Sequence, residues 1–379
     1  MIARTPSVET RGGNMPKNIV VLIDGTGNDV ASDATNVLRL ARMLPESNEQ
    51  KFVYDPGVGT QGAPTRDLVG RRLFVTAVDL GFGSGVYDKI ATGYRAIIDR
   101  YEPGDRLYLF GFSRGAYVAR ALAGLIGKVG ILERGRDNLV PYAVKLYAAP
   151  TNIGVARTFT KTFCDRSANI RFLGLWDTVK SVFSVDLTTK KLTSVSLPRT
   201  YVNRSVSVVR HAVAIDERRR FFRPNLWSDD GTDGSATDVK QVWFAGVHSD
   251  VGGGYPIKDN ALSALPLEWM VREAMEQGLL IDETRRGRVL KSVAGPSSKP
   301  PHLALMNDSL VGRWRYAEKI PKLGKPGPDG GGRTGWYLPE GERRFIREGA
   351  SVHRSVVDRK NGGIGYDPVN LPNTYVLVD

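Results

Sequence analysis

Leu107-Tyr108-Leu109-Phe110-Gly111-Phe112-Ser113-Arg114-Gly115-Ala116 joins a short apolar run to a serine that stands between two glycines. The apolar run is typical of a strand that is buried on both faces of a parallel sheet. Residues 116–131 follow it and are rich in Ala and Leu, which predicts a helix. A serine at a tight strand-to-helix turn is the arrangement called a nucleophile elbow, in which the glycines prevent collisions with neighbouring backbone. The alternative is a tight turn without a chemical role.

The segments on both sides of this stretch alternate between buried-strand and amphipathic-helix patterns, which favours a parallel α/β sheet. We assign residues 206–222 to a helix, although strand spacing fits them about as well, and residues 180–200 to a peripheral hairpin or cap. Beyond Gly295 the pattern weakens. The remaining expected strands cover residues 17–23, 51–54, 170–175 and 242–247, and the remaining expected helices cover residues 36–44, 86–101 and 262–277. The sequence therefore predicts an α/β-hydrolase fold, with a mostly parallel central sheet flanked by helices and with peripheral insertions.

The expected domain organisation is simple. Residues 1–16 are polar and are interpreted as a flexible tail. Residues 17–379 are assigned to one α/β-hydrolase domain with insertions at about 180–240 and 281–345. We expect a single catalytic domain because no internal repeat or sharp change of composition divides the chain.

Composition and charge restrict the class of protein. With 53 Lys and Arg against 40 Asp and Glu, the net charge is +13, which favours contact with acidic surfaces. The basic residues are scattered in short groups and match no nucleic-acid-binding module, so we expect no nucleic-acid partner. A solvated basic surface and an anionic membrane surface both remain as interpretations.

The cysteine content and the N-terminus give an expectation for localisation. Cys164 is the single cysteine, which excludes an internal disulfide framework and a cysteine-based metal site. The first 17 residues lack the apolar run of about 7 to 15 residues that a signal peptide needs. We therefore expect a protein that is cytoplasmic as synthesised, has no signal peptide, and needs no cofactor or metal. The acidic loop at residues 229–238 lacks the spacing of a calcium loop and is interpreted as a solvated loop.

A serine nucleophile needs a base, and the chain has four histidines. His248 follows the expected strand at residues 242–247, so it should lie at the carboxyl edge of the sheet, where sites in parallel sheets gather. His353 is the rival base, although it could equally be a buried, hydrogen-bonded residue. His211 falls in the expected helix and His302 in a proline-flanked loop, and both are weaker candidates.

The base in turn needs an acid that orients it, which in this fold lies between the serine and the histidine. Asp177 follows the expected strand at residues 170–175 and should reach the same edge of the sheet. Asp216 is the rival, but it stands beside Glu217 and an arginine run that together suggest an ion-paired helix end. We favour Asp177.

The oxyanion hole should combine the backbone N–H of Arg114 with an N–H from the loop that follows the first strand. Gly25 and Thr26 are the candidates in that loop, because glycines allow the backbone to approach a reacting carbonyl. Asp24 is a candidate for supporting the loop, and Asp250 and His353 are further candidate supporting residues.

Five motifs in this order resemble one bacterial family, namely the α/β-hydrolase domains that include phospholipase effectors of the type VI secretion system. The motifs are Asp24-Gly25-Thr26-Gly27-Asn28, Gly111-Phe112-Ser113-Arg114-Gly115-Ala116, Leu175-Trp176-Asp177-Thr178-Val179, Asp216-Glu217-Arg218-Arg219 and His248-Ser249-Asp250-Val251-Gly252-Gly253-Gly254-Tyr255. The resemblance implies a Ser-Asp-His lipase or phospholipase that cleaves acyl esters of membrane glycerophospholipids. It also implies export by a secretion apparatus and an immunity protein as candidate partners. The alternatives are an esterase, thioesterase or peptidase acting on a soluble substrate, or a non-catalytic binding protein on a hydrolase scaffold.

Overall fold

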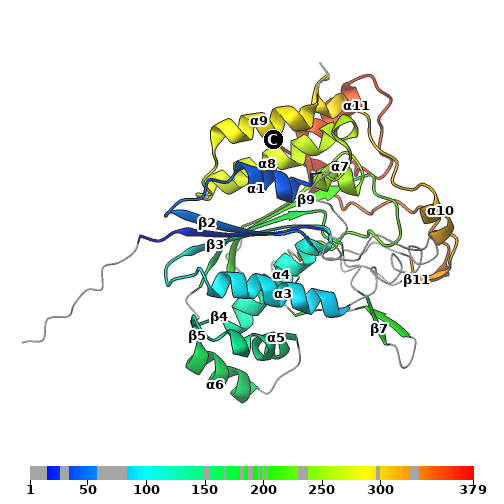
Figure 1. Cartoon of the computed structure of the whole chain (residues 1–379). Coiled ribbons are helices and arrows are strands. Elements are labelled where there is room, and N and C mark those ends of the chain that lie inside the picture. The colour runs from blue at the N-terminus through cyan, green and yellow to red at the C-terminus, as the bar shows by residue number, and fades with distance from the viewer. Residues whose placement is uncertain are drawn as a thin grey trace, which may run out of the picture.

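Eight parallel strands form the central sheet of the computed structural model, in the spatial order β14-β13-β10-β9-β6-β3-β1-β2 (Figure 1). The structure describes residues 15–25, 34–57, 83–148, 153–165, 168–179, 183–186, 191–194, 197–198, 200, 203–228, 238–295, 299–324 and 333–379. The strands are β1 (Asn18–Ile23), β2 (Gln50–Asp55), β3 (Arg106–Phe112), β6 (Ile170–Trp176), β9 (Val206–Ala214), β10 (Asp238–Phe244), β13 (Ala350–His353) and β14 (Tyr375–Val378). The predicted α/β fold with a parallel central sheet is confirmed.

Helices cover both faces of this sheet (Figure 1). One face carries α3 (Gly83–Ile98), α4 (Arg114–Val129), α5 (Val140–Ala148) and α6 (Ile153–Phe163), and the other carries α1 (Asn36–Met43), α8 (Ala264–Glu276), α9 (Glu283–Ala294) and α11 (Arg354–Asn361). Val21 and Leu109 point to the first layer, whereas Val20 and Phe110 point to the second. Because both faces of β1 and β3 are covered, the sequences of these two strands are almost continuously apolar and do not alternate.

Shorter elements complete the described part of the chain. They are α7 (His248–Gly252), α10 (Arg313–Ala317), the strand pairs β4 (Ile131–Leu132) with β5 (Cys164–Asp165), β7 (Phe183–Asp186) with β8 (Lys191–Ser194) and β11 (Lys322–Gly324) with β12 (Gly335–Tyr337), and the single 3-10 turns η1 (Asp137–Leu139), η2 (Ile257–Asp259), η3 (Ala261–Ser263) and η4 (Pro301–Leu303). The antiparallel pair β7–β8 confirms the hairpin that was predicted within residues 180–200. Residues 1–14 of the predicted tail lie outside the described residues. The division into tail, domain and insertions stays a prediction.

The helix predicted over residues 206–222 is wrong. Val206–Ala214 form the strand β9, which pairs with β6 on one side and with β10 on the other. Val206, Val208, Val209 and Val213 of this strand are buried. β-Branched side chains fit a pleated, buried surface better than a helix, and in a central strand their packing decides between the two spacings. His211 consequently lies on a strand, and Asp216 follows a strand and is not at a helix end.

Two strands of the central sheet, β13 and β14, lie in the region where the sequence pattern weakens. Each has four residues, and β14 forms the edge of the sheet with its side chains half-buried or exposed. Strands this short carry too few residues for a recognisable period. In the described part of the chain, no helix is long and apolar enough to cross a membrane.

Candidate active site

The carboxyl edge of the sheet brings together three side chains that follow neighbouring strands. Ser113 follows β3, Asp177 follows β6, and His248 opens α7 shortly after β10. The Ser113 N–H donates to the Trp176 carbonyl oxygen (3.0 Å), and the Asp177 N–H donates to the Ala212 carbonyl oxygen (2.8 Å). These bonds continue the pairing of the sheet into the two turns, so the sheet itself fixes where the serine and the aspartate lie.

The turn at Ser113 is strained and depends on its flanking glycines. Ser113 has φ 58° and ψ −122°, a region that residues with a side chain rarely adopt. A methyl group at Gly111 would lie 2.6 Å from the Gly115 carbonyl oxygen, and one at Gly115 would collide with the carbonyl oxygen of Ile23. Both positions therefore require glycine, as is expected for a nucleophile elbow.

The Ser113, His248 and Asp177 side chains form a chain of close contacts. His248 Nε2 lies 2.8 Å from Ser113 Oγ, and His248 Nδ1 lies 2.5 Å from Asp177 Oδ2. All three residues are buried. Phe112 and Phe222 hold the imidazole ring between them, with ring centroids 4.7 and 4.9 Å from that of His248. In this arrangement the imidazole can accept the serine proton at Nε2 while Nδ1–H donates to the aspartate.

Asp177 is held by a buried arginine from the distant end of the chain. Arg344 Nη1 lies 2.6 Å from Asp177 Oδ1, and Nη2 lies 2.9 Å from Oδ2. Oδ1 also accepts the Ala214 N–H (2.9 Å). Burial raises the pKa of Asp177, but the Arg344 guanidinium and His248 outweigh that effect, so the pKa lies well below its usual value. The carboxylate is therefore ionised at neutral pH even though it is fully buried.

His248 is neutral at neutral pH. Burial lowers the pKa of its imidazole, and the opposing effect of Asp177 is smaller. The charge of Asp177 is already balanced by Arg344, so it stabilises an imidazolium less than a lone carboxylate would. A neutral imidazole is the form that can take a proton from a serine hydroxyl.

The main chain around His248 is fixed by two buried acids. The His248 N–H donates to Glu217 Oε2 (3.2 Å), and Glu217 also binds Arg219 and Ser309. Asp250 accepts the Val247 N–H (3.0 Å) and Asn307 Nδ2–H (2.7 Å), and its supporting role stays a prediction. Burial raises the pKa of Asp250 to about 6, and Arg219 offsets burial to lower the pKa of Glu217 to about 2.

The structure places the rival acid and base candidates in other contacts. Asp216 Oδ2 accepts the Gly246 N–H and the Tyr366 hydroxyl, both at 2.8 Å. His353 caps α11 through Ser355 and stacks on Phe244, with ring centroids 4.5 Å apart. Burial lowers the pKa of His353 to about 4, so it is a neutral, structural imidazole.

The two remaining histidines also lie elsewhere. His302 belongs to η4. His211 is buried on β9 and its Nε2 accepts the Thr178 N–H (3.1 Å), which supports the turn that carries Asp177. Burial lowers the pKa of His211 to about 3, so it too is neutral.

Asp24 and Gly25 are the described residues of the loop after β1, where two oxyanion donors are predicted. The backbone of Asp24 closely approaches Gly115. Asp24 accepts the Thr35 hydroxyl (2.5 Å) and the Tyr54 hydroxyl (2.7 Å), as expected of a residue that holds the loop in shape. The Gly25 N–H donates to Asp24 Oδ1 (2.6 Å). To stabilise an oxyanion, this N–H would have to leave Asp24 and donate to the substrate oxygen.

The last predicted features to place are the other oxyanion donors, Arg114 and Thr26, and the acidic loop. Arg114 is the first residue of α4, where backbone N–H groups point toward the edge of the sheet that carries Ser113. Thr26 lies outside the described residues, as do residues 229–237 of the acidic loop. Among the described residues, no group of three or more His, Cys, Asp or Glu is placed to hold a metal ion.

Sequence reasoning missed three residues that hold the site together, namely Arg344, Glu217 as a partner of the histidine backbone, and Phe222. Glu217 and Phe222 lie in the segment that was assigned to a helix. Arg344 is one of two adjacent arginines, 167 positions from Asp177. No local pattern distinguishes it from its exposed neighbour Arg343.

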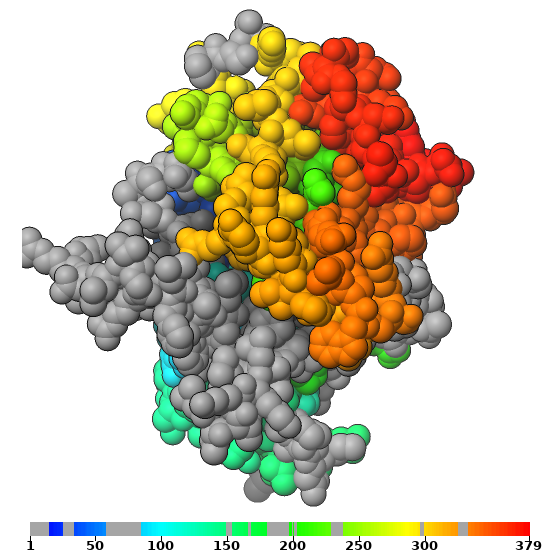
Figure 2. Space-filling model, turned by 90° about the vertical axis from the view of Figure 1, so that its right-hand side faces the viewer, coloured from blue at the N-terminus to red at the C-terminus, as the bar shows by residue number. Residues whose placement is uncertain are grey.

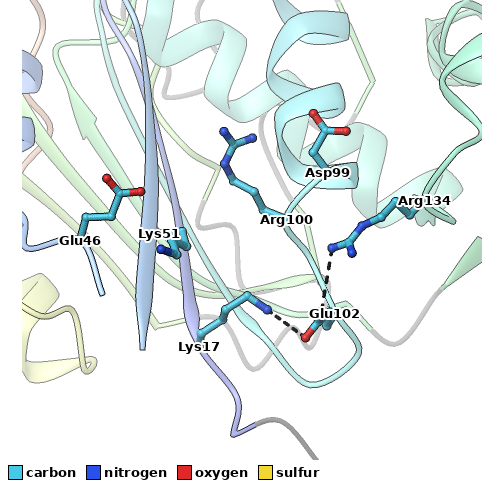
Figure 3. A pocket seen from close by; sticks show the side chains of 7 residues that line it. All are labelled: Lys17, Glu46, Lys51, Asp99, Arg100, Glu102 and Arg134. Atoms are coloured by element: carbon cyan, nitrogen blue, oxygen red, sulfur yellow. Dashed lines mark hydrogen bonds and ion pairs between the residues drawn. The ribbon is translucent and has the colours of Figure 1, made fainter. Parts of the chain in front are cut away.

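A separate hollow of about 460 Å³ lies at the opposite, amino edge of the sheet (Figure 3). Charged side chains line it, and Glu102 lies 3.2 Å from Lys17 and 3.9 Å from Arg134. The lining residues are Lys17, Glu46, Lys51, Asp99, Arg100, Glu102 and Arg134. The hollow has no serine or histidine and lies away from Ser113, because Lys17 precedes the first strand and Ser113 follows the end of its neighbour.

A parallel sheet with a strained serine, a histidine and a buried carboxylate at its carboxyl edge defines the α/β-hydrolase class of protein. A family model described as "T6SS, Phospholipase effector Tle1-like, catalytic domain" matches residues 17–273. The chain belongs to this family.

Individual relatives match only part of the chain, and the chain matches only part of each relative. An uncharacterized protein of Saccharomyces cerevisiae, YEL023C, is 36% identical over 236 residues, which are 58% of this chain and 33% of the yeast protein. A crystal structure of an uncharacterized Pseudomonas aeruginosa protein is 19% identical with a TM-score of 0.38, covering 76% of this chain and 52% of that one. The Tle1 effector bound to the VgrG spike of the type VI secretion system is 19% identical with a TM-score of 0.36, covering 67% and 56%. The chain thus spans about a third of the yeast relative and about half of each solved structure.

Proposed function

We propose that this protein is a serine ester hydrolase of phospholipase type that cleaves acyl esters of membrane glycerophospholipids. Two contacts support the proposal: Ser113 Oγ lies beside His248 Nε2, and His248 Nδ1 lies beside Asp177. Ser113 also stands at a strained turn directly before the N-terminus of α4. Membership of a phospholipase catalytic-domain family supports the lipid substrate.

In the proposed reaction Ser113 Oγ attacks the ester carbonyl carbon while its proton passes to His248 Nε2. The carbonyl oxygen becomes an oxyanion, which the Arg114 N–H and an N–H of the loop after β1 would stabilise. When this intermediate collapses, the ester C–O bond breaks and Nε2 returns the proton to the leaving alcohol oxygen. Water then repeats the sequence on the acyl-enzyme, with one proton going to Nε2 and back to Ser113 Oγ. Asp177 orients the imidazole and stabilises its protonated form throughout.

The test compares the intact protein with Ser113→Ala on two substrates, p-nitrophenyl butyrate in solution and vesicles that contain phosphatidylglycerol and phosphatidylethanolamine. Ser113→Ala should remove hydrolysis of both, and it should also remove labelling by a fluorophosphonate probe. Ser47→Ala is the matched control, because Ser47 is exposed and its hydroxyl oxygen accepts the neighbouring Glu49 N–H at the surface. Hydrolysis that survives Ser113→Ala would refute the mechanism.

The same experiment separates the alternatives. Hydrolysis of the soluble ester without release of fatty acid from vesicles would indicate an esterase, thioesterase or peptidase that acts on a soluble substrate. Lack of probe labelling in the intact protein would indicate a non-catalytic binding protein. For the partners, we propose delivery by a type VI apparatus, as the family description suggests. We also propose neutralisation by an immunity protein. Loss of export in a strain that lacks the apparatus would support that part of the proposal.

A further inference from the structure

A surface beside the active site exposes several large apolar side chains. It consists of residues 311–324 and 333–338, which comprise α10 and the β11–β12 hairpin, and we call it the α10–hairpin surface. Tyr316 and Trp336 are each 73% exposed, and Ile320 and Leu323 are at least half exposed. Leu323 and Trp336 face each other across the hairpin, so they form one apolar cluster. Figure 2 shows that this part of the chain, in yellow-orange and orange, lies at the centre of one face of the molecule.

The exposed charges on the α10–hairpin surface are all positive. Arg313, Arg315, Lys319 and Arg333 are exposed. The only acidic residue within these two ranges is Glu318, which is buried and accepts backbone N–H groups of residues 220 and 341. Three acids lie just outside the surface: exposed Asp308, 3.8 Å from Arg315, exposed Glu340, and half-buried Glu342, which accepts the Tyr337 hydroxyl (2.9 Å). Solvent screens the exposed Asp308–Arg315 pair. Apolar rings among unbalanced cations are unusual for a surface that only faces water.

The same surface is joined to the active site by one layer of aromatic rings. Trp314 of α10 packs edge-on against Phe222, with centroids 5.4 Å apart, and Phe222 packs against His248. Arg219 lies over Phe222, 3.6 Å from the ring centroid, and Arg220 binds the Ala317 carbonyl oxygen (2.9 Å). The loop that supports the histidine therefore also holds α10 in place.

We propose that the α10–hairpin surface docks onto an anionic phospholipid bilayer. Tyr and Trp favour the boundary between headgroups and acyl chains, and Arg and Lys favour anionic headgroups, so the two kinds of side chain present here match the two layers of a bilayer surface. A second copy of this chain would fit less well, because pairing the surface with itself would bring its cations together. The inference deepens the proposed function and rests on it, because a phospholipase must reach lipids that are packed in a membrane.

The test measures vesicle binding by flotation, in a Ser113→Ala background so that lipid is not consumed. Vesicles contain phosphatidylcholine alone or phosphatidylcholine with phosphatidylglycerol. Arg313→Gln with Lys319→Gln should weaken binding to the anionic vesicles about 30-fold, since each cation near such a surface strengthens binding about fivefold. The double variant Tyr316→Ser, Trp336→Ser should weaken vesicle binding by about tenfold for each ring lost, because each ring leaves water when the parent protein binds.

A matched control comes from α6, which exposes Arg157, Lys161 and Val155 in a region away from α10 (Figure 1). The triple variant Val155→Ser, Arg157→Gln, Lys161→Gln should bind vesicles like the parent. Thermal unfolding of each variant checks that the fold is kept. Added salt should weaken binding of the parent, because it screens the cations.

Three results would overturn the proposal. The first is no binding of the parent to anionic vesicles, and the second is equal loss in the α6 control. The third is a dimer, seen by light scattering, that Trp336→Ser converts to a monomer, which would identify the surface as a contact between copies. Vesicle binding does not require a reactive serine, so the two proposals can fail separately. If the proposed function is wrong, the intact protein does not hydrolyse lipid, whatever the flotation experiment shows.

Discussion

Replacing Arg344 by Gln should destabilise the protein strongly and in a pH-dependent way. Arg344 is 1% exposed and makes two bonds to Asp177 and one each to the carbonyl oxygens of Ala214 and Phe222. Its loss leaves a fully buried carboxylate without its cation. Removing one partner of a buried ion pair costs about 3 to 5 kcal/mol. We therefore expect the free energy of unfolding in urea at pH 7.5 to fall by that amount.

The pH dependence follows from the pKa of Asp177. In the intact protein this pKa is depressed, so the ion pair contributes its stability above the unfolded-state pKa near 3.8 and loses it as pH falls through the folded value. In Arg344→Gln, burial raises the pKa of Asp177 without the opposing arginine. Protonation then relieves the uncompensated charge, so the deficit in unfolding free energy should shrink between pH 7.5 and pH 5.

The dependence of kcat/KM on pH gives a second measurement, which does not depend on the free energy of unfolding. Because the pKa of His248 is lowered, kcat/KM of the intact protein on a soluble ester should decline only below pH 6.5. Removing a neighbouring positive charge raises the proton affinity of the Asp177–His248 pair, so the decline in Arg344→Gln should begin at higher pH.

Arg343→Gln is the control for both measurements, because Arg343 is adjacent and exposed, and it should change the unfolding free energy by less than about 0.5 kcal/mol. A loss below about 1 kcal/mol in Arg344→Gln, or an equal loss at both pH values, would refute the reasoning.

Three further predictions concern Asp177, the serine turn and helix α9. Asp177→Asn should lower kcat on a soluble ester by about 10⁴-fold, whereas Asp216→Asn should keep most of the activity; similar losses in both would mean that the acid is misassigned. Gly115→Ala should prevent accumulation of folded protein, as judged by soluble yield, because its methyl group would collide with backbone of β1. Gly287→Ala, in α9, should raise the unfolding free energy by about 0.5 to 1 kcal/mol, because beyond its own helix backbone and chain neighbours no described atom lies within 4 Å of the added methyl; a decrease would contradict this open space.

The apolar strands β1 and β3 were predictable from sequence, whereas β9 and the C-terminal strands β13 and β14 were not. β1 and β3 are short apolar runs that end in glycine-containing turns, and this combination has few other interpretations. β9 contains polar and charged residues among its valines, because Arg210 is buried with Glu273 and His211 with Thr178. Such buried polar partners come from other elements, so the local pattern resembles the partly polar face of a helix.

The positions of Ser113, Asp177 and His248 could be predicted because each follows a buried strand, and parallel strands end at a common edge. The structure brings these side chains together, and their catalytic roles stay predictions until activity is measured. Arg344 could not be found in this way. Its contact with Asp177 spans 167 positions, and its other partners, the carbonyl oxygens of Ala214 and Phe222, are also distant in sequence.

The arginine that balances Asp177 has a consequence for when the site is complete during synthesis. The ribosome releases the chain from its N-terminus, and segments that emerge early fold first. His248 precedes Arg344 by 96 residues, and Asp177 and Ser113 precede it by 167 and 231, so all three emerge well before it. Asn307 and Ser309 also follow them. A nascent chain that ends near residue 273 therefore holds all three side chains but lacks the cation that Asp177 needs in its buried position. The contacts of Asp177 are therefore complete only after Arg344 has been synthesised, so a chain that ends before Arg344 cannot form the site as the structure shows it.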